Sequence, residues 1–267
     1  MLSDLRKHAR ELLEKDDVKV VIGYGEGSGG SARAVFIRTP DDTESLILDD
    51  RCNQNLTVYL HKPEVRALGK PAIIARTPGL RTINQLMAEN QIREGDIVVL
   101  GVTDEGTIVN FPDIKSVGHH VSKIHMELTP ENRERLDKIS KMSREERWDF
   151  WVKELSACVK CYACRAACPL CYCEQCTVDC NKPQWISVPS HQLGNMEWHI
   201  MRAMHLAGRC VDCGDCYRAC PLGIPLNLLT QKLHQDITEA FIISGEEEKP
   251  AYPLGTFRPD DKEDFIR

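Results

Sequence analysis

Twelve of the thirteen cysteines lie between Cys158 and Cys220, and only Cys52 lies outside this stretch. The stretch begins with CVKCYACRAACP and ends with CVDCGDCYRACP, so the spacing C-x2-C-x2-C-x3-C-P occurs twice. The N-terminal sequence MLSDLRKHAR lacks the apolar segment of a secretory signal, and we therefore expect a cytoplasmic protein. Because thiols are kept reduced in that compartment, dense and regularly spaced cysteines indicate metal ligands rather than disulfides.

The repeated spacing is that of bacterial-type ferredoxins. In these proteins three cysteines of one run bind a 4Fe–4S cluster together with the fourth cysteine of the other run. The pattern therefore predicts two 4Fe–4S clusters held by two crossed sets of ligands. A pair of zinc sites is the weaker alternative, because zinc needs only four thiolates and C-x2-C pairs suffice for it. Set one consists of Cys158, Cys161, Cys164 and Cys220. Set two consists of Cys210, Cys213, Cys216 and Cys168.

Four further cysteines follow the first run in the segment LCYCEQCTVDC, namely Cys171, Cys173, Cys176 and Cys180. Two clusters do not need them. They could hold a third 4Fe–4S cluster or a zinc ion, or they could remain spare or regulatory thiols. Cys52 is expected to be a buried free thiol, since an unligated cysteine packs as a small apolar side chain.

The charges beside the two runs differ. Lys160 and Arg165 flank the first run, whereas Asp212 and Asp215 flank the second. Positive charge near a cluster favours its reduced, more negative state. We therefore predict the higher reduction potential for the cluster of set one.

Residues 1–128 are predicted to form an α/β domain in which helices cover a small, mostly parallel sheet. Apolar runs at 18–24 and 32–38 flank the turn GEGSGGS, and further strands are expected at 71–76 and 96–102. A dinucleotide-binding loop would need a helix directly after the glycines, whereas a strand follows them here. We therefore assign no catalytic or cofactor-binding residue to this domain and expect no FAD.

Three histidines, His119, His120 and His125, lie close together in VGHHVSKIHME. They could bind a metal, but no carboxylate or cysteine at matching spacing accompanies them, so surface histidines are the favoured interpretation. Residues 129–243 are predicted to form a helical dicluster domain of the bacterial-ferredoxin type. Residues 244–267 are charged and proline-containing, and we expect an extended C-terminal tail.

An aromatic helix is predicted directly before the first cysteine. Ser143 and Glu146 form a capping-box pattern at its start, and Trp148, Trp151 and Leu155 make the helix apolar. We expect it to pack against the cysteine stretch and to exclude water from it. A surface for a partner protein is the alternative.

The totals exclude two classes of function. The formal net charge of −6 and the pI near 5.9 argue against binding to nucleic acid, which depends on clustered lysines and arginines. No run approaches the roughly 20 apolar residues that span a bilayer. No membrane span is therefore predicted.

The chain resembles the iron–sulfur beta subunits of formate dehydrogenases and of deazaflavin-coenzyme hydrogenases. It also resembles the dicluster ferredoxin subunits of heterodisulfide-reductase-type complexes. The resemblance rests on the two cysteine runs and the continuation CPLCYCEQC. In the first domain it rests on VKVVIGYGEG, VFIRTPDD, ALGKPAIIARTPGLRTI and DIVVLGVTDEG.

The resemblance implies an iron–sulfur electron-transfer subunit of a multi-subunit anaerobic oxidoreductase. Such a subunit relays single electrons between a partner's flavin or metal site and another subunit or a ferredoxin. The alternative is a flavin-containing oxidoreductase, linked to a deazaflavin, a nicotinamide or formate. The family often carries a cysteine where Gly79 stands here, and a second one where this chain reads GVTDEG. We therefore expect the first domain to be a docking scaffold rather than a catalytic site.

Overall fold

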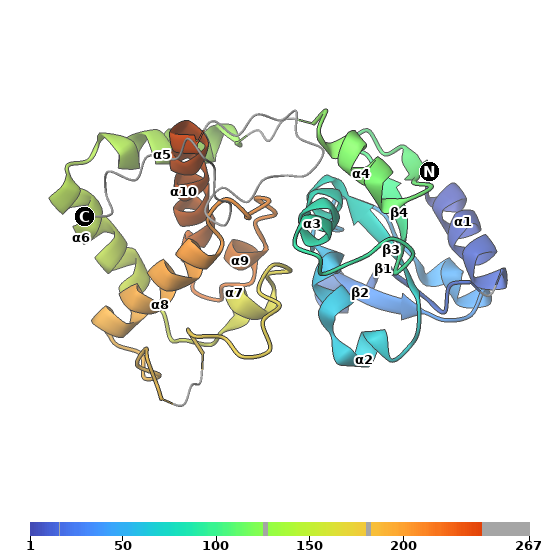
Figure 1. Cartoon of the computed structure of the whole chain (residues 1–267), viewed down its shortest axis with the longest axis horizontal. Coiled ribbons are helices and arrows are strands. Elements are labelled where there is room, and N and C mark those ends of the chain that lie inside the picture. Colours follow the sequence, from blue (N-terminus) through green and yellow to red (C-terminus); the bar gives the residue numbers. More distant parts are fainter. Residues whose placement is uncertain (16, 125–127, 180–182, 242–267) are drawn as a thin grey trace.

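The computed structural model describes residues 1–15, 17–124, 128–179 and 183–241 (Figure 1). An α/β part and a helical part lie side by side. His125, Cys180 and the predicted tail lie outside the described residues.

The α/β part is built on a five-stranded sheet with the order β2-β1-β3-β4-β5. Its strands are β1 (Val20–Glu26), β2 (Ala32–Ile37), β3 (Pro71–Arg76), β4 (Val98–Val102) and β5 (Ile108–Asn110). The central strands β1, β3 and β4 run parallel to one another. They carry the β-branched runs, which suit strands that are buried on both faces.

The sheet is mixed rather than mostly parallel. β2 pairs antiparallel with β1, and β5 pairs antiparallel with β4. The reason is the length of the connections, because a parallel neighbour needs a crossover of a dozen or more residues. The turn between β1 and β2 contains only Gly27 to Ser31, with the short 3-10 helix Ser28–Gly30, and the turn between β4 and β5 is equally short.

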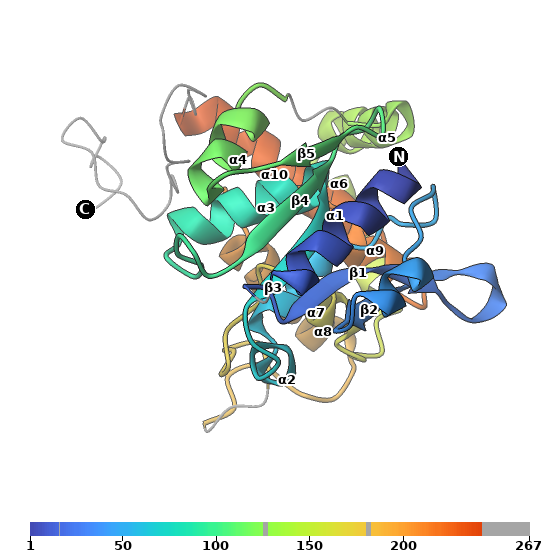
Figure 2. The ribbon, with the colours of Figure 1, turned by 90° about the vertical axis from the view of Figure 1, so that its right-hand side faces the viewer.

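Helices cover both faces of the sheet. Figures 1 and 2 show α1 (Leu2–Glu14) on the face away from the helical part and α3 (Thr77–Ala88) on the face toward it. α4 (Ile114–Val121) packs beside α3, while α2 (Pro63–Arg66) lies in the connection before β3. Leu5 and Ala9 of α1 are fully buried, so its apolar stripe faces the sheet as the pattern requires.

The helical part surrounds the cysteine stretch. The predicted capping box of Ser143 and Glu146 is formed at the start of one helix, and Thr129 Oγ1 accepts from Asn132 N at 3.2 Å at the start of another. The helices among the described residues of this part are α5 (Pro130–Lys141), α6 (Arg144–Ser156), α7 (Ala163–Ala166), α8 (Gln192–His205), α9 (Asp215–Arg218) and α10 (Leu226–Phe241).

One hydrophobic core joins the two parts. Leu170, Leu206 and Val211 of the helical part are buried in the same cluster as the sheet residues. At its rim, Arg209 makes a bidentate ion pair with Glu89 at the end of α3, with both N–O distances 2.5 Å. The Tyr172 hydroxyl donates to the same carboxylate at 2.7 Å. The α/β part is therefore packed directly onto the second cysteine run.

Candidate metal centres

The two cysteine runs have matching backbone conformations. Lys160 and Asp212, each two residues after the first cysteine, have φ values of 52° and 54°. Tyr162 and Gly214, each directly after the second cysteine, have φ values of 60° and 75°. Left-handed conformations at non-glycine residues cost free energy and persist where the surroundings require them. The runs are thus a structural repeat whose loops curl in the same way.

Each curl directs backbone N–H groups at cysteine sulfur. Lys160 N donates to Cys158 Sγ at 3.3 Å, and a backbone hydrogen bond from Asp212 lowers the pKa of Cys210 against the larger effect of burial. The short helices α7 and α9 then begin at equivalent positions and pack against each other. Preformed N–H donors of this kind stabilise thiolate ligands, because they favour the charged form of sulfur.

The cysteines of set one come from both ends of the cysteine stretch 158–220 and lie around one cavity. Cys158, Cys161 and Cys164 line the same cavity as Cys220, which lies more than fifty residues further along the chain. The cavity measures only about 20 Å³. A cluster would therefore require the thiols to move apart, as happens when metal binding and the final folding of a site are coupled.

The wall of this cavity fits such a group. Trp198 and His199 of α8 line it, both are almost fully buried, and Trp198 Nε1 and His199 Nε2 have no hydrogen-bond partner among the described residues. Burial lowers the pKa of His199 to about 3, so the ring is neutral. Buried N–H groups normally find an acceptor. Thiolate or sulfide sulfur in the cavity would provide one.

Set two is assembled in the same crossed manner. Cys168 of the first run lies close enough to Cys210, Cys213 and Cys216 for its charge to raise the pKa of each of them. Burial is the larger cause, and it raises these three pKa values to about 12. The pKa of Cys168 is instead lowered, chiefly by its hydrogen bond with Cys171. The three thiols of the second run would therefore ionise more readily beside a positive centre, which a bound metal cluster would supply.

The described cysteines of the segment after the first run, Cys171, Cys173 and Cys176, have different surroundings. Cys171 shares a hydrogen bond with Cys168 and so lies beside set two. Cys173 is exposed, and Cys176 bonds to the side chain of Arg165. Among the residues that the structure describes, no three His, Cys, Asp or Glu side chains are already arranged as a metal site, and this holds for set one and set two as well as for these cysteines. Cys180 falls in the undescribed segment, so the proposed third site stays a prediction.

His119 and His120 lie in the last turn of α4, remote from both cysteine sets in the sequence, and His120 packs edge-on against Phe111. Cys52 is fully buried in the core of the α/β part, and burial raises the pKa of its thiol. A buried free thiol at this position is the role that the sequence predicts.

The charged residues beside the first run, Lys160 and Arg165, make contacts with other segments of the chain. Lys160 is buried, and its Nζ donates to the carbonyl of Ser187. Arg165 turns away to the segment after the run, where it donates to Cys173 O at 3.0 Å and pairs with Asp179 at 3.1 Å. Arg165 therefore holds the following segment, LCYCEQCTVD, against the first run.

The negative charges of the acidic residues beside the second run are partly compensated by hydrogen bonds and an ion pair. Asp215 accepts from Asn55 N of the α/β part at 2.8 Å and pairs with Arg218. Asp212 accepts two hydrogen bonds from Gln231 Nε2, at 2.7 and 2.8 Å. Burial raises the pKa of both carboxyls. The contrast in charge between the two runs is therefore smaller than the sequence suggests.

The structure adds one charged residue that the motif analysis did not consider. Arg202 of α8 is only 4 % exposed, and it donates to Cys164 O at 3.0 Å. Its side chain also hydrogen-bonds to Cys168 and Cys171. Its Nε has no partner among the described residues. Arg202 therefore lies between set one and set two. The signal in the sequence was its place four residues after Trp198, on the buried stripe of α8.

No family model matches the chain. Over 88 residues it is 32% identical to the F420-dependent formate dehydrogenase subunit beta of Methanocaldococcus jannaschii. The chain resembles a formate dehydrogenase beta subunit. The matched stretch covers 33% of this chain and 22% of the relative, so the chain spans about a fifth of the length of that protein. The predicted resemblance to formate dehydrogenase beta subunits is thereby confirmed.

A cavity of about 230 Å³ lies where the α/β part meets the second run. Tyr24, Arg76 and Gly79 line it together with Cys213. Gly79 is packed closely, since a Cβ there would lie 3.2 Å from Ala75 Cβ. The cavity is smaller than the roughly 300–1,000 Å³ of typical small-molecule sites. It therefore gives no support to a flavin site at this place.

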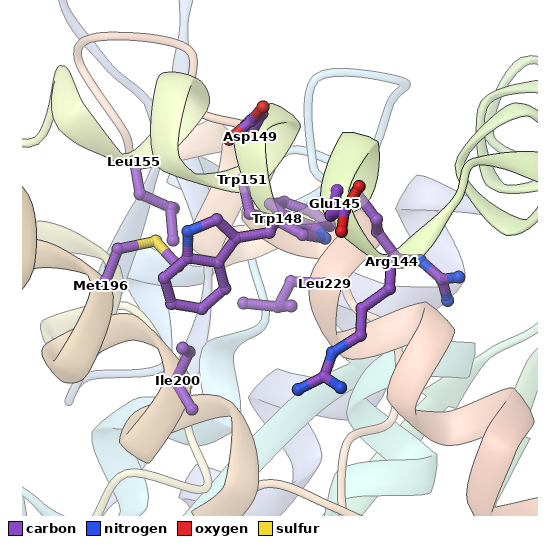
Figure 3. Close-up of a pocket in the computed structure, with 10 residues that line it drawn as sticks. Arg144, Glu145, Trp148, Asp149, Trp151, Leu155, Met196, Ile200 and Leu229 are labelled. Atoms are coloured by element: carbon purple, nitrogen blue, oxygen red, sulfur yellow. The ribbon is translucent and has the colours of Figure 1, made fainter.

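The aromatic helix α6 packs against the cysteine stretch as predicted, while the alternative of a partner surface stays a prediction. Leu155 is fully buried beside Cys158 and Cys164 and so helps to exclude water from set one. Trp148 is 55 % exposed, and it lines an apolar groove of about 1,000 Å³ between α6, α8 and α10 (Figure 3). Met196 and Ile200 of α8 form the opposite wall. No described helix is long and apolar enough to cross a membrane.

Proposed function

We propose that this chain is an iron–sulfur electron-transfer subunit of a multi-subunit anaerobic oxidoreductase and that it holds two 4Fe–4S clusters. One cluster is bound by set one and the other by set two. Electrons pass singly between a partner's flavin or metal site and another subunit or a ferredoxin. Two observations support the proposal: Cys220 lines one cavity with the cysteines of the first run, and Cys168 lies near enough to Cys213 for its charge to raise the pKa of that thiol.

The residues of the chain have clear tasks in this function. The eight thiolates hold the clusters, which supply one-electron chemistry when bound. Curled loops and N–H donors keep sulfur in place without rearrangement during a redox change. Leu155, Trp198, Ile224 and Leu226 exclude water from set one. Low polarity at this place restricts solvent access and tunes the potential.

The relative's name makes it part of a formate dehydrogenase that depends on F420, and this supports a place in an oxidoreductase complex. A flavin enzyme remains the alternative function. The small size of the cavity beside Cys213 and the presence of Gly79 speak against it. We therefore propose electron relay without a catalytic residue of its own.

Anaerobic reconstitution followed by iron and sulfide analysis tests the proposal. Two 4Fe–4S clusters give about eight irons per chain, and a third cluster gives about twelve. Cys220→Ala removes one ligand of set one, so the content should fall toward about four irons and one of two EPR signals should be lost. Cys52→Ala is the matched control, because its thiol lies in the α/β core, and it should leave the content unchanged. Full iron content in Cys220→Ala would contradict the crossed ligation.

A further inference from the structure

One stripe of α8 is both buried and polar. Asn195, Trp198, His199 and Arg202 recur at intervals of three and four residues, so they lie along the same face of the helix. Each is at most 4 % exposed, and each has one polar atom without a hydrogen-bond partner among the described residues. Buried polar atoms are normally hydrogen-bonded, so unpaired atoms along a whole stripe require a cause.

Both ends of this polar stripe hold the backbone of the first cysteine run. Asn195 Nδ2 donates to Cys158 O at 2.8 Å. One turn further along and beyond, Arg202 Nη2 donates to Cys164 O at 3.0 Å. The polar stripe and the loop that carries three thiols of set one are therefore fixed to each other.

Trp198 and His199 occupy the middle of the polar stripe, and both line the cavity of set one. The Trp198 ring packs edge-on against Tyr162 of the curled loop, with the ring centroids 5.5 Å apart. Of the described cysteines, only the four of set one line this cavity. The unpaired nitrogens Trp198 Nε1 and His199 Nε2 are therefore associated with set one and not with set two.

We infer that Trp198 Nε1–H and His199 Nε2–H donate hydrogen bonds to sulfur of the cluster in set one and thereby raise the reduction potential of that cluster alone. This rests on the proposed function, because the acceptors are the sulfur atoms of a bound cluster. An indole nitrogen only donates, and a neutral imidazole has one hydrogen, which an acceptor at Nε2 holds on that nitrogen. Hydrogen bonds to cluster sulfur stabilise the reduced, more negative state and so help to set the potential.

These donors give a second reason for the higher potential that the flanking charges predict for set one. Lys160 and Arg165 make their own contacts with other segments of the chain. Arg202 contacts cysteines of both sets, so its charge acts on both potentials. Trp198 and His199 line the cavity of one set only, and their effect separates the two potentials.

The test uses the reconstituted full chain and the variants Trp198→Phe and His199→Phe, which keep an aromatic ring and remove the N–H group. Potentiometric titration followed by EPR gives both potentials, and the signal that Cys220→Ala removes identifies set one. Each variant should lower the equilibrium constant for reduction of that cluster by roughly tenfold, about 59 mV for a one-electron couple, and leave the other cluster unchanged. Trp148→Phe and His119→Phe are the matched controls, because both side chains are exposed outside the cavity, and they should change neither potential.

Pulsed EPR of the reduced wild type, isotopically labelled at nitrogen in tryptophan or in histidine, is the second measurement. A weak nitrogen coupling to one cluster is expected from each label, and it should vanish in the corresponding variant. Unchanged potentials in either fully loaded variant would overturn the inference, as would equal falls at both clusters or a labelled wild type without weak coupling. A coupling from His199 as strong as that of an iron-bound nitrogen would make this residue a ligand and refute its role as a donor. A reconstituted chain that binds no iron would instead contradict the proposed function.

Discussion

If set one and set two hold the two proposed clusters, replacing Arg202 by methionine should lower the reduction potentials of both. The guanidinium is buried between the two cysteine sets and contacts Cys164 of set one and Cys168 of set two. Its positive charge stabilises the reduced state, in which a cluster carries one more negative charge. Methionine preserves much of the side-chain length and apolar contact but removes the charge. The potential of each cluster should therefore fall.

The size of the shift follows from Coulomb's law. For a unit charge roughly 7 Å from a cluster centre and an effective dielectric constant of about 20, the interaction is about 2 kcal/mol. For a one-electron couple, about 1.4 kcal/mol corresponds to about 59 mV, so the expected fall is on the order of 100 mV. Desolvation and relaxation reduce the electrostatic effect, so this value is the upper end of the expected fall in potential. Arg202→Lys keeps the charge, so its shift should be much smaller.

Potentiometric titration followed by EPR measures both potentials in one experiment. Iron content is determined first, so that a variant that fails to assemble is recognised. Arg33→Met is the control, because Arg33 lies on β2 and hydrogen-bonds only to Glu26 O among the contacts described. Unchanged potentials in a fully loaded Arg202→Met protein would refute the reasoning. A fall of the same size in Arg202→Lys would also refute it, because lysine retains the positive charge.

Two further predictions concern how the parts are held together. Glu89→Gln weakens the bidentate pair with Arg209 and should lower the free energy of unfolding by about 1–3 kcal/mol, measured by denaturant titration. A double-mutant cycle of Glu89→Gln and Arg209→Met should give a coupling free energy of at least about 1 kcal/mol, and additive effects on the free energy of unfolding would argue against the pair. Removal of iron by a chelator should speed amide exchange in 158–169 and 210–221 more than in β3. Uniform acceleration throughout the chain would contradict a local stabilising role for the clusters.

The local structure was largely predictable from the sequence. The buried runs of β1, β3 and β4, the capped starts of α5 and α6, and the buried Cys52 all follow from short-range signals. These features depend on side-chain periodicity, caps and motif geometry, which are encoded within about twenty residues of one another.

Long-range contacts were not predictable in the same way. Asn55 N bonds to Asp215 across 160 positions in the sequence, and this contact could not be read from either motif. The direction of Arg165 toward Asp179 and the burial of Arg202 depend on how the helices pack. The buried runs of β1, β3 and β4 predict the parallel centre of the sheet. The antiparallel pairing of β2 and β5 is instead determined by the short turns, which those runs do not encode.

The shared core has a consequence for how this protein can be taken apart. A fragment starting near residue 129 would retain every cysteine of both runs, yet it would expose Leu170, Leu206 and Val211, which the sheet side of the molecule now covers. Such a fragment would expose an apolar, aggregation-prone surface directly beside set two. Oxygen and water would reach a site that the intact chain shields. The α/β part therefore covers the set two side of the cysteine stretch, and we expect that this stretch cannot be cut out as an independent folding unit.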